Sequence, residues 1–156
     1  MYNPNDEASV EADRKKMMQA QYKGDQVVRA LGIELVECRH GYGKAIMPLD
    51  GRQGNVLGIA HGGAIFTLAD MAMGMAAYGS GYLCVTLNTN ISFLKPGLKG
   101  PLVAEARQIS ESTKIGNIEV SVTDADGQLI AQASYMAYKK NPEHFREHLE
   151  SLHAAE

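Results

Sequence analysis

The stretch that decides the fold is HGGAIFTLADMAMGMAAYG, residues 61–79. Between residues 64 and 77 nearly every side chain is apolar, and the exceptions are Thr67, Asp70 and Gly74. A helix that is apolar on all sides belongs in a protein interior, because none of its faces gains from contact with water. The stretch is shorter than the roughly 20 apolar residues that a bilayer requires, and a carboxylate lies near its middle. We therefore predict a central core helix and not a membrane span.

Two features of this helix point to chemistry. Burial of an ionised carboxylate such as Asp70 costs on the order of several kcal/mol unless hydrogen bonds, an opposite charge or protonation compensate. Gly62 and Gly63 allow close approach of another molecule to the backbone, and the first N–H groups of a helix have no intrahelical partner. The start of the helix is therefore a candidate site for stabilising an oxyanion.

The spacing of these two features predicts an oligomer. Gly63 and Asp70 are two helical turns apart, so they share one face but lie about 10 Å apart along the axis at ~1.5 Å per residue. One carbonyl group cannot contact both. If the two features cooperate, two copies of the helix must lie antiparallel, with Asp70 of one chain near the glycines of the other. The sequence thus predicts a dimer with composite sites.

The remaining chain predicts helices at both ends and strands between them. Residues 10–31 mix charges with a sparse apolar side, which indicates a covering helix with a break near Gly24. Short strands follow over 33–39 and 44–49, joined by a tight hairpin turn around Tyr42. After residue 142, a short helix is indicated by Phe145, Leu149 and Leu152 at helical spacing.

Strict alternation marks the strands after the central helix. In residues 85–93 the apolar side chains are at Val85, Leu87, Ile91 and Phe93, and Thr86 falls on the polar side. Residues 102–107, 118–122 and 129–137 repeat the alternation with many alanines, which would let a sheet approach a helix closely. The predicted architecture is α+β, an antiparallel sheet of five to six strands curled around one long helix.

Length and composition fit one globular domain. We divide its 156 residues into an N-terminal helical extension (1–31), a main domain (32–140) and a C-terminal helical tail (141–156). Fifteen basic and eighteen acidic residues give a net charge of −3, which does not attract nucleic acid. Cys38 and Cys84 are far apart and the N-terminus is polar, so we expect a cytoplasmic protein with reduced thiols.

The chain resembles the hotdog-fold acyl-CoA thioesterases of the phenylacetate-degradation (PaaI-like) type. The resemblance lies in the loop that contains Asn55, the run HGGAIFTLAD, the strand CVTLNTNISFLKP and the closing strands. The resemblance covers about residues 32–140, and its specific part is the HGG followed by an acidic residue. It implies a sheet wrapped around a helix, a homodimer that often pairs into a homotetramer, and a site between subunits. This agrees with the dimer inferred from the helical rise.

By this resemblance, Asp70 is the nucleophile or the general base toward water, and the Gly62 N–H forms the oxyanion hole. Asn55 is expected to face the thioester carbonyl or the attacking water, His61 to support the site, and Thr86 to orient water. Each assignment has a structural alternative. Asp70 can hydrogen-bond neighbouring backbone, the glycines can serve turn geometry, Asn55 can form a turn, and Thr86 can be an ordinary strand residue.

A CoA thioester also needs cations for its phosphates and an apolar slot for its acyl group. The candidates for the phosphates are Lys95, Arg107 and Lys114, which can equally be solvated surface charges. The expected acyl-site residues are Phe66, Met71, Met73 and Met75, although methionines at helical spacing are often core residues. Gly63 is a further expected substrate-binding residue. His144 and His148 lie one turn apart but have no third metal ligand, so neither a metal nor a cofactor is expected, coenzyme A being part of the substrate.

We therefore predict an acyl-CoA thioesterase. The first alternative is an enoyl-thioester hydratase or dehydratase, in which a histidine and an acidic residue work as a pair, as His61 and Asp70 can. The second is a non-catalytic acyl-CoA-binding protein. A regulator of that kind would carry a DNA-binding module, and the N-terminal segment lacks a helix-turn-helix pattern.

Overall fold

The structure, a computed structural model, describes residues 7–154, apart from the side chains of residues 9, 142, 149, 152 and 153. Four helices and six strands follow one another in this part of the chain. In order they are α1 (Glu7–Gly24), α2 (Gln26–Leu31), β1 (Glu34–Arg39), β2 (Tyr42–Met47), α3 (Gly62–Gly79), β3 (Cys84–Phe93), β4 (Leu102–Glu111), β5 (Ile115–Thr123), β6 (Leu129–Lys139) and α4 (Pro142–Ala154).

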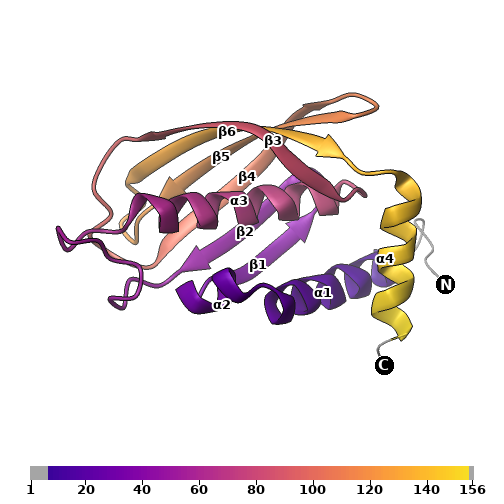
Figure 1. Cartoon of the computed structure of the whole chain (residues 1–156), viewed down its shortest axis with the longest axis horizontal. Helices are drawn as coiled ribbons and strands as arrows, with labels where there is room; N and C mark the ends of the chain where they lie inside the picture. The colour runs from indigo at the N-terminus through magenta and orange to yellow at the C-terminus, as the bar shows by residue number, and fades with distance from the viewer. Residues whose placement is uncertain (1–6, 155–156) are drawn as a thin grey trace.

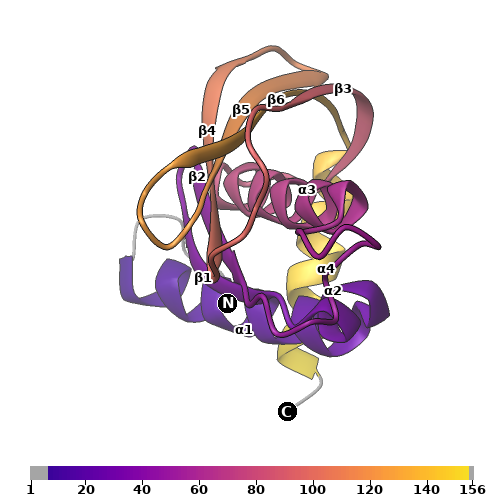
Figure 2. The same cartoon turned by 90° about the vertical axis from the view of Figure 1, so that its left-hand side faces the viewer.

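One antiparallel sheet curls around α3, in the strand order β1-β2-β4-β5-β6-β3. Seen nearly along α3, the sheet rises from β1 and arches over the helix to β3, while α1 and α2 lie beneath it (Figure 2). The predicted α+β architecture, a sheet wrapped around one long apolar helix, is confirmed. None of the described helices is both long and apolar enough to cross a bilayer.

Small residues let the sheet approach α3 closely. On the inner face of the sheet, Ala104, Ala106 and Ala137 are fully buried. At Gly43 in β2 an added Cβ would lie 2.2 Å from the Ala72 carbonyl oxygen, so only glycine fits where β2 passes α3. This glycine was interpreted from the sequence as part of the β1–β2 turn, but it sits inside a strand and serves helix packing.

Strand β3 differs from its prediction in one respect. Thr86 pairs with Ala137 and Asn88 pairs with Met136, so Leu87 is an extra residue in a β-bulge. The strict period of two inferred from the sequence is therefore wrong at this position. Beyond the bulge Ile91 pairs with the buried Ala133, and before it Thr86 also lies on the side of the sheet that faces α3, not on the opposite side.

The terminal helices cover one side of α3. The predicted break near Gly24 is confirmed, because Asp25 follows it as the N-cap of α2 and accepts hydrogen bonds from the Val27 and Val28 N–H groups. Helix α4 stands beside α1 and the C-terminal end of α3 (Figures 1 and 2). Its Phe145 is half-buried, whereas the side chains of Leu149 and Leu152 lie outside the described part of the chain.

One face of α3 and one edge of the sheet remain open in the single chain. Strand β3 is the last in the sheet and pairs on one side only, with β6. Its Val85, Leu87 and Phe93 are 45%, 55% and 52% exposed. Beside this edge, Gly63 and Asp70 lie on the one stripe of α3 that the rest of the chain leaves accessible. This open face contains two of the residues predicted to be functional, Gly63 and Asp70.

Candidate active site

Asp70 points out of α3 toward β3, where Thr86 meets it. The Thr86 hydroxyl donates a hydrogen bond of 3.0 Å to Asp70 Oδ1, and this bond is possible because Thr86 lies on the inner face of the sheet. Burial raises the pKa of the Asp70 carboxyl, the Thr86 bond lowers it, and the charge of Asp25 raises it further. The carboxyl is thus oriented by one donor while its charged form is destabilised by its surroundings.

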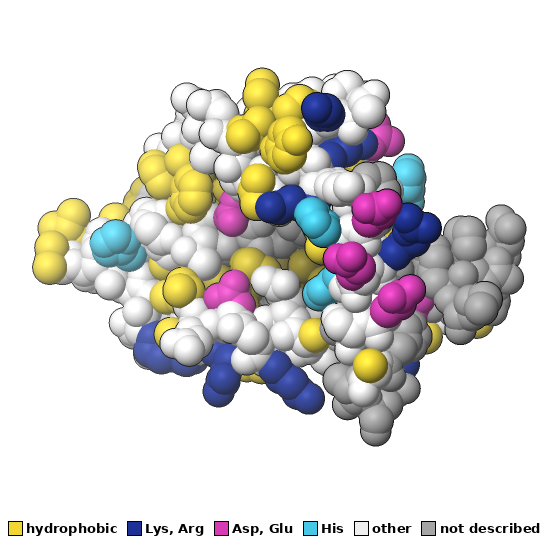
Figure 3. Space-filling model, turned by 45° about the vertical axis from the view of Figure 1, so that its right-hand side comes forward, with side chains coloured by type: hydrophobic (Ala, Val, Ile, Leu, Met, Phe, Trp, Pro, Cys, Tyr) yellow, Lys and Arg dark blue, Asp and Glu magenta, His cyan; other side chains and the backbone are white. Residues whose placement is uncertain are grey.

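A pocket of about 450 Å³ opens beside Asp70. Its floor is the C-terminal half of α3, which contributes the predicted acyl-site residues Met71, Met73 and Met75. Thr86 lines it from β3. The space-filling view onto the α4 side shows a hollow in the middle of that face, with acidic, histidine and basic side chains around it (Figure 3). We call this the Asp70 pocket.

The start of α3 leaves one backbone donor without a protein acceptor. His61 is the N-cap, and its Nδ1 accepts a hydrogen bond of 2.8 Å from the Gly63 N–H. Among the described residues no acceptor is recorded for the Gly62 N–H, whereas the N–H groups of Ala64 and Ile65 both bond to the His61 carbonyl. His61 therefore caps the helix, and within the described part of the chain Gly62 keeps a donor without an acceptor at the positive end of the helix.

A second pocket, of about 340 Å³, lies at this helix start. It is lined by Asn55, Gly62, Phe93 and Lys95, and we call it the Gly62 pocket. The Asn55 side-chain oxygen accepts hydrogen bonds from the Leu57 and Ile59 N–H groups, so it forms a turn, as the structural alternative had it. The Asn55 side-chain amide nitrogen has no acceptor among the described residues, and a contact of Asn55 with a ligand stays a prediction.

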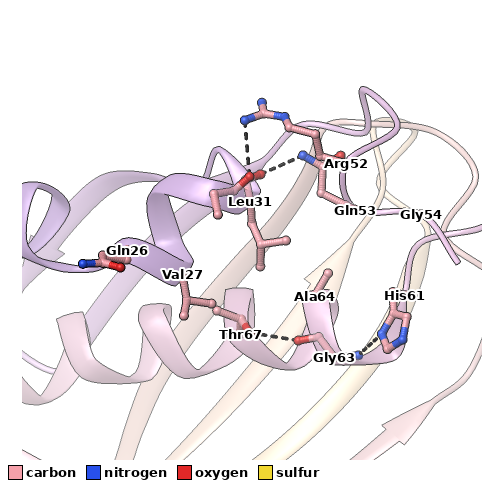
Figure 4. A pocket seen from close by; sticks show the side chains of 11 residues that line it. Gln26, Val27, Leu31, Arg52, Gln53, Gly54, His61, Gly63, Ala64 and Thr67 are labelled. Carbon is pink, nitrogen blue, oxygen red and sulfur yellow. Dashed lines mark hydrogen bonds between the residues drawn. The ribbon is translucent and has the colours of Figure 1, made fainter.

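The loop before α3 is fixed by contacts to α2. Arg52 donates to the Ala30 carbonyl and the buried Gln53 donates to the Leu31 carbonyl at 2.7 Å. Figure 4 shows these bonds together with Gly63 and Thr67 across a third pocket, between α2 and α3. The Gln53 carbonyl in turn accepts from the His61 N–H. This chain of bonds sets the position at which α3 begins.

The two halves of the predicted site do not meet within one chain. Gly62 and Asp70 line different pockets and are separated by eight residues of helix, about 12 Å at ~1.5 Å per residue. A single carbonyl carbon cannot be reached from both. Within one chain the geometry thus agrees with the separation predicted from the sequence.

The other predicted ligand residues fall into two groups. Lys95 and Met73 line the Gly62 and Asp70 pockets respectively, and the Phe66 ring lies 6.2 Å from that of Tyr135 beneath the sheet. In contrast, Arg107 stacks on the ring of Tyr42, and Lys114 lies in the turn between β4 and β5. The single chain does not bring these last two side chains to either pocket.

Several pocket residues were missed by the sequence analysis, among them three from the N-terminal and C-terminal segments. Gln21 and Asp25, from α1 and the start of α2, and His148, from α4, all line the Asp70 pocket. The only sequence signal was the spacing of His144 and His148, which was weighed as a metal pair. Among the side chains that the structure describes, no group of three or more metal-ligating residues gathers.

Comparisons with known proteins agree on one family. Residues 57–131 match the model of the thioesterase superfamily. A putative esterase of Archaeoglobus fulgidus is 31% identical over 77% of this chain and 79% of its own. The acyl-coenzyme A thioesterase PaaI of Escherichia coli is 31% identical over 65% of this chain and 74% of its own. The chain belongs to the thioesterase superfamily.

Solved structures of similar proteins share the fold. The PaaI structure superposes with a TM-score of 0.78 at 24% identity, and covers 85% of this chain and 96% of its own. The smu.793 protein of Streptococcus mutans, solved with acetyl-CoA bound, has a TM-score of 0.66 at 28% identity over 70% of this chain and 89% of its own. The chain is a hotdog-fold thioester hydrolase of the PaaI-like type.

Proposed function

We propose that this thioesterase hydrolyses acyl-CoA thioesters, with Asp70 as the catalytic carboxylate. The observation that carries the proposal is the half-buried Asp70 carboxyl, held by Thr86 at the edge of a largely apolar pocket. The acyl-CoA specificity is supported by the PaaI thioesterase and by the acetyl-CoA bound to the smu.793 protein.

In the proposed reaction Asp70 takes a proton from water as the water oxygen attacks the thioester carbonyl. The negative charge that develops on the carbonyl oxygen is stabilised by the Gly62 N–H, and the C–S bond then breaks as the thiolate of CoA leaves and is protonated. Burial, which raises the pKa of Asp70, makes its carboxylate a stronger base. Direct attack by Asp70 to give an anhydride uses the same arrangement of groups.

We propose that the site forms between two antiparallel copies of α3. Two observations support this proposal: the β3 edge is open and carries exposed apolar side chains, and a stripe of α3 beside it is accessible. If Asp70 of one chain faces Gly62 of the partner subunit, the two-fold axis passes near residue 66, midway between them. Each dimer then holds two identical sites, and pairing of two such dimers into a tetramer is a further prediction.

Complementation tests the composite site. Gly62→Pro removes the N–H, and the position suits proline because it is the first residue of α3. The preceding His61 already has the extended backbone that precedes proline, with φ −65° and ψ 134°. The second variant is Asp70→Asn. Each alone is expected to lose at least about 100-fold in kcat, the typical loss for one oxyanion donor.

Mixed and refolded together, the two variants give heterodimers in which one site has both defects and the other has none. Random pairing restores about a quarter of the wild-type activity. Gly62→Ala, which keeps the N–H, is the matched control, although its Cβ must fit beside the Phe93 ring at 3.3 Å. Lack of recovery in the mixture would refute the shared site, and unchanged turnover of Asp70→Asn would refute the mechanism.

Free thiol release separates the proposed function from the two alternatives. A thioesterase liberates CoA thiol from saturated and unsaturated acyl-CoAs, an enoyl-thioester hydratase adds water and leaves the thioester intact, and a binding protein does neither. The engagement of His61 Nδ1 in capping α3 leaves it less free to act as a catalytic base. A cytoplasmic location and the absence of a cofactor stay predictions.

A further inference from the structure

The Asp70 pocket is built partly by segments outside residues 57–131, the range that matches the family model. Gln21 of α1, Asp25 before α2 and His148 of α4 line it together with Asp70. His148 also lines a smaller pocket on its other side, next to α1. Gln21 and Asp25 line both pockets as well, so these three residues form the boundary between them.

Helix α4 is held at this place by contacts with the end of α3. The Phe145 ring lies 5.1 Å from the ring of Tyr78, and the His148 ring lies 6.0 Å from it in an edge-on arrangement. Tyr78 is 6% exposed and lies eight residues, about 12 Å, beyond Asp70 along the helix. An acyl group whose carbonyl is next to Asp70 would extend along α3 toward His148.

The ionised side chains that line the Asp70 pocket are acidic. Two carboxylates, Asp25 and Asp70, line it, and none of its described lining residues is lysine or arginine. Burial lowers the pKa of His148, which favours the neutral imidazole there. Within the single chain, the far end of an acyl group would thus lie in a pocket whose described lining holds carboxylates and no lysine or arginine. Lys139, whose Nζ lies 4.4 Å from the ring of the lining residue Tyr82, is already paired with Glu111. A carboxylate at that end would therefore meet the charge of Asp25 and lose hydration without a free cation to compensate.

We propose that the Asp70 pocket selects uncharged acyl groups and that α4 makes this selection, with His148 contacting the distal end of the acyl group. The proposal rests on the proposed function, because it assigns the acyl group to this pocket. It makes Asp25 and His148 specificity-determining residues, contributed by parts of the chain outside the family match.

The test compares hexanoyl-CoA with adipoyl-CoA, which has the same number of acyl carbons but ends in a carboxylate. The wild-type enzyme is expected to favour hexanoyl-CoA in kcat/KM by at least about tenfold, since like charges in a partly desolvated site are strongly disfavoured. His148→Lys supplies a cation and Asp25→Asn removes a negative charge while keeping the helix cap. Each is expected to shift the ratio toward adipoyl-CoA by about tenfold.

Two control variants separate charge in the pocket from other effects. His144→Lys adds the same charge one turn earlier on α4 at an exposed position outside the Asp70 pocket, and should leave the substrate ratio unchanged. His148→Gln keeps a neutral hydrogen-bonding side chain and should also leave the ratio near that of the wild type. Equal use of both substrates by the wild type, or an unmoved ratio in both His148→Lys and Asp25→Asn, would overturn the proposal.

A binding measurement keeps this test distinct from the proposed function. Calorimetry with thioether analogues of the two substrates, which cannot be hydrolysed, reports the same preference without turnover. Discrimination in binding without any hydrolysis would retain the selective pocket and refute the thioesterase proposal. Hydrolysis without discrimination would retain the thioesterase proposal and refute the selective pocket. Binding of neither analogue together with no thiol release from either substrate would refute both.

Discussion

Replacement of Thr86 by valine should lower kcat/KM more at acidic pH than at neutral pH. Valine keeps the shape and the β-branch of threonine but removes the hydroxyl that donates to Asp70 Oδ1 at 3.0 Å. A hydrogen bond to a charged group contributes about 1.5–3 kcal/mol. Thr86 is exposed in the single chain, so we take the lower value, which corresponds to about tenfold in rate.

The direction of this pH effect follows from the charge state of Asp70 that the Thr86 hydrogen bond stabilises. The Thr86 donor favours ionised Asp70 and so lowers its pKa, against the larger effect of burial, which raises it. Without the donor the pKa of Asp70 rises further, and the acidic limb of the kcat/KM profile moves to higher pH. Activity in that limb should fall about tenfold, with a smaller loss on the plateau.

The assay is release of CoA thiol from a saturated acyl-CoA, followed between about pH 5 and 9 to cover the titration of a carboxyl with a raised pKa. Thr86→Ser keeps the hydroxyl and is the matched control. If the valine variant has the profile of the wild type, or if serine and valine behave alike, the Thr86 hydroxyl does not tune Asp70 and the assignment of the site is wrong.

Three further predictions follow from the same geometry. Because burial raises the pKa of Asp70, the folded state binds its proton more tightly than the unfolded chain, and stability falls as pH rises through that pKa. Asp70→Asn should therefore raise Tm at pH 7.5. Calorimetry should show that the difference in Tm between the variant and the wild type vanishes in acid. Gly43→Ala would place its Cβ 2.2 Å from a carbonyl oxygen, so it should cost about 3 kcal/mol and lower Tm by roughly 10 °C. The control Gly24→Ala, with no atom within 4 Å, should change stability by less than about 1 kcal/mol; equal effects would refute the close helix–sheet contact. Lys95→Ala should raise KM for acyl-CoA about fivefold with kcat unchanged, and the rise in KM should be smaller at high salt. An unchanged KM in steady-state kinetics would show that Lys95 does not contact CoA.

The sequence was most informative where one local pattern decides the structure. The uniformly apolar run of α3 required burial, and alternation with small residues required a sheet packed closely on it. The separation of Gly63 from Asp70 followed from the rise of a helix alone. These inferences needed no knowledge of tertiary contacts.

Tertiary packing decided what the sequence did not reveal. The bulge at Leu87 changes which side of β3 faces the helix, and alternation cannot show an extra residue. Asp25 and His148 reach the Asp70 pocket only because α1, α2 and α4 fold against α3. Arg107, expected at the CoA phosphates, stacks in the single chain on the ring of Tyr42, its cross-strand partner in β2, and its phosphate contact stays a prediction.

The bulge also means that β3 holds one residue more than its neighbour β6 needs. Removing Leu87 would leave a regular ladder with Thr86 still opposite Ala137 and Asn88 still opposite Met136. A deletion farther along β3, at Asn90 for example, would move the side chains between the bulge and the deletion to the opposite face of the sheet. A chain one residue shorter at position 87 can therefore keep the same inward-facing residues, so length variation at this point need not signal a different enzyme.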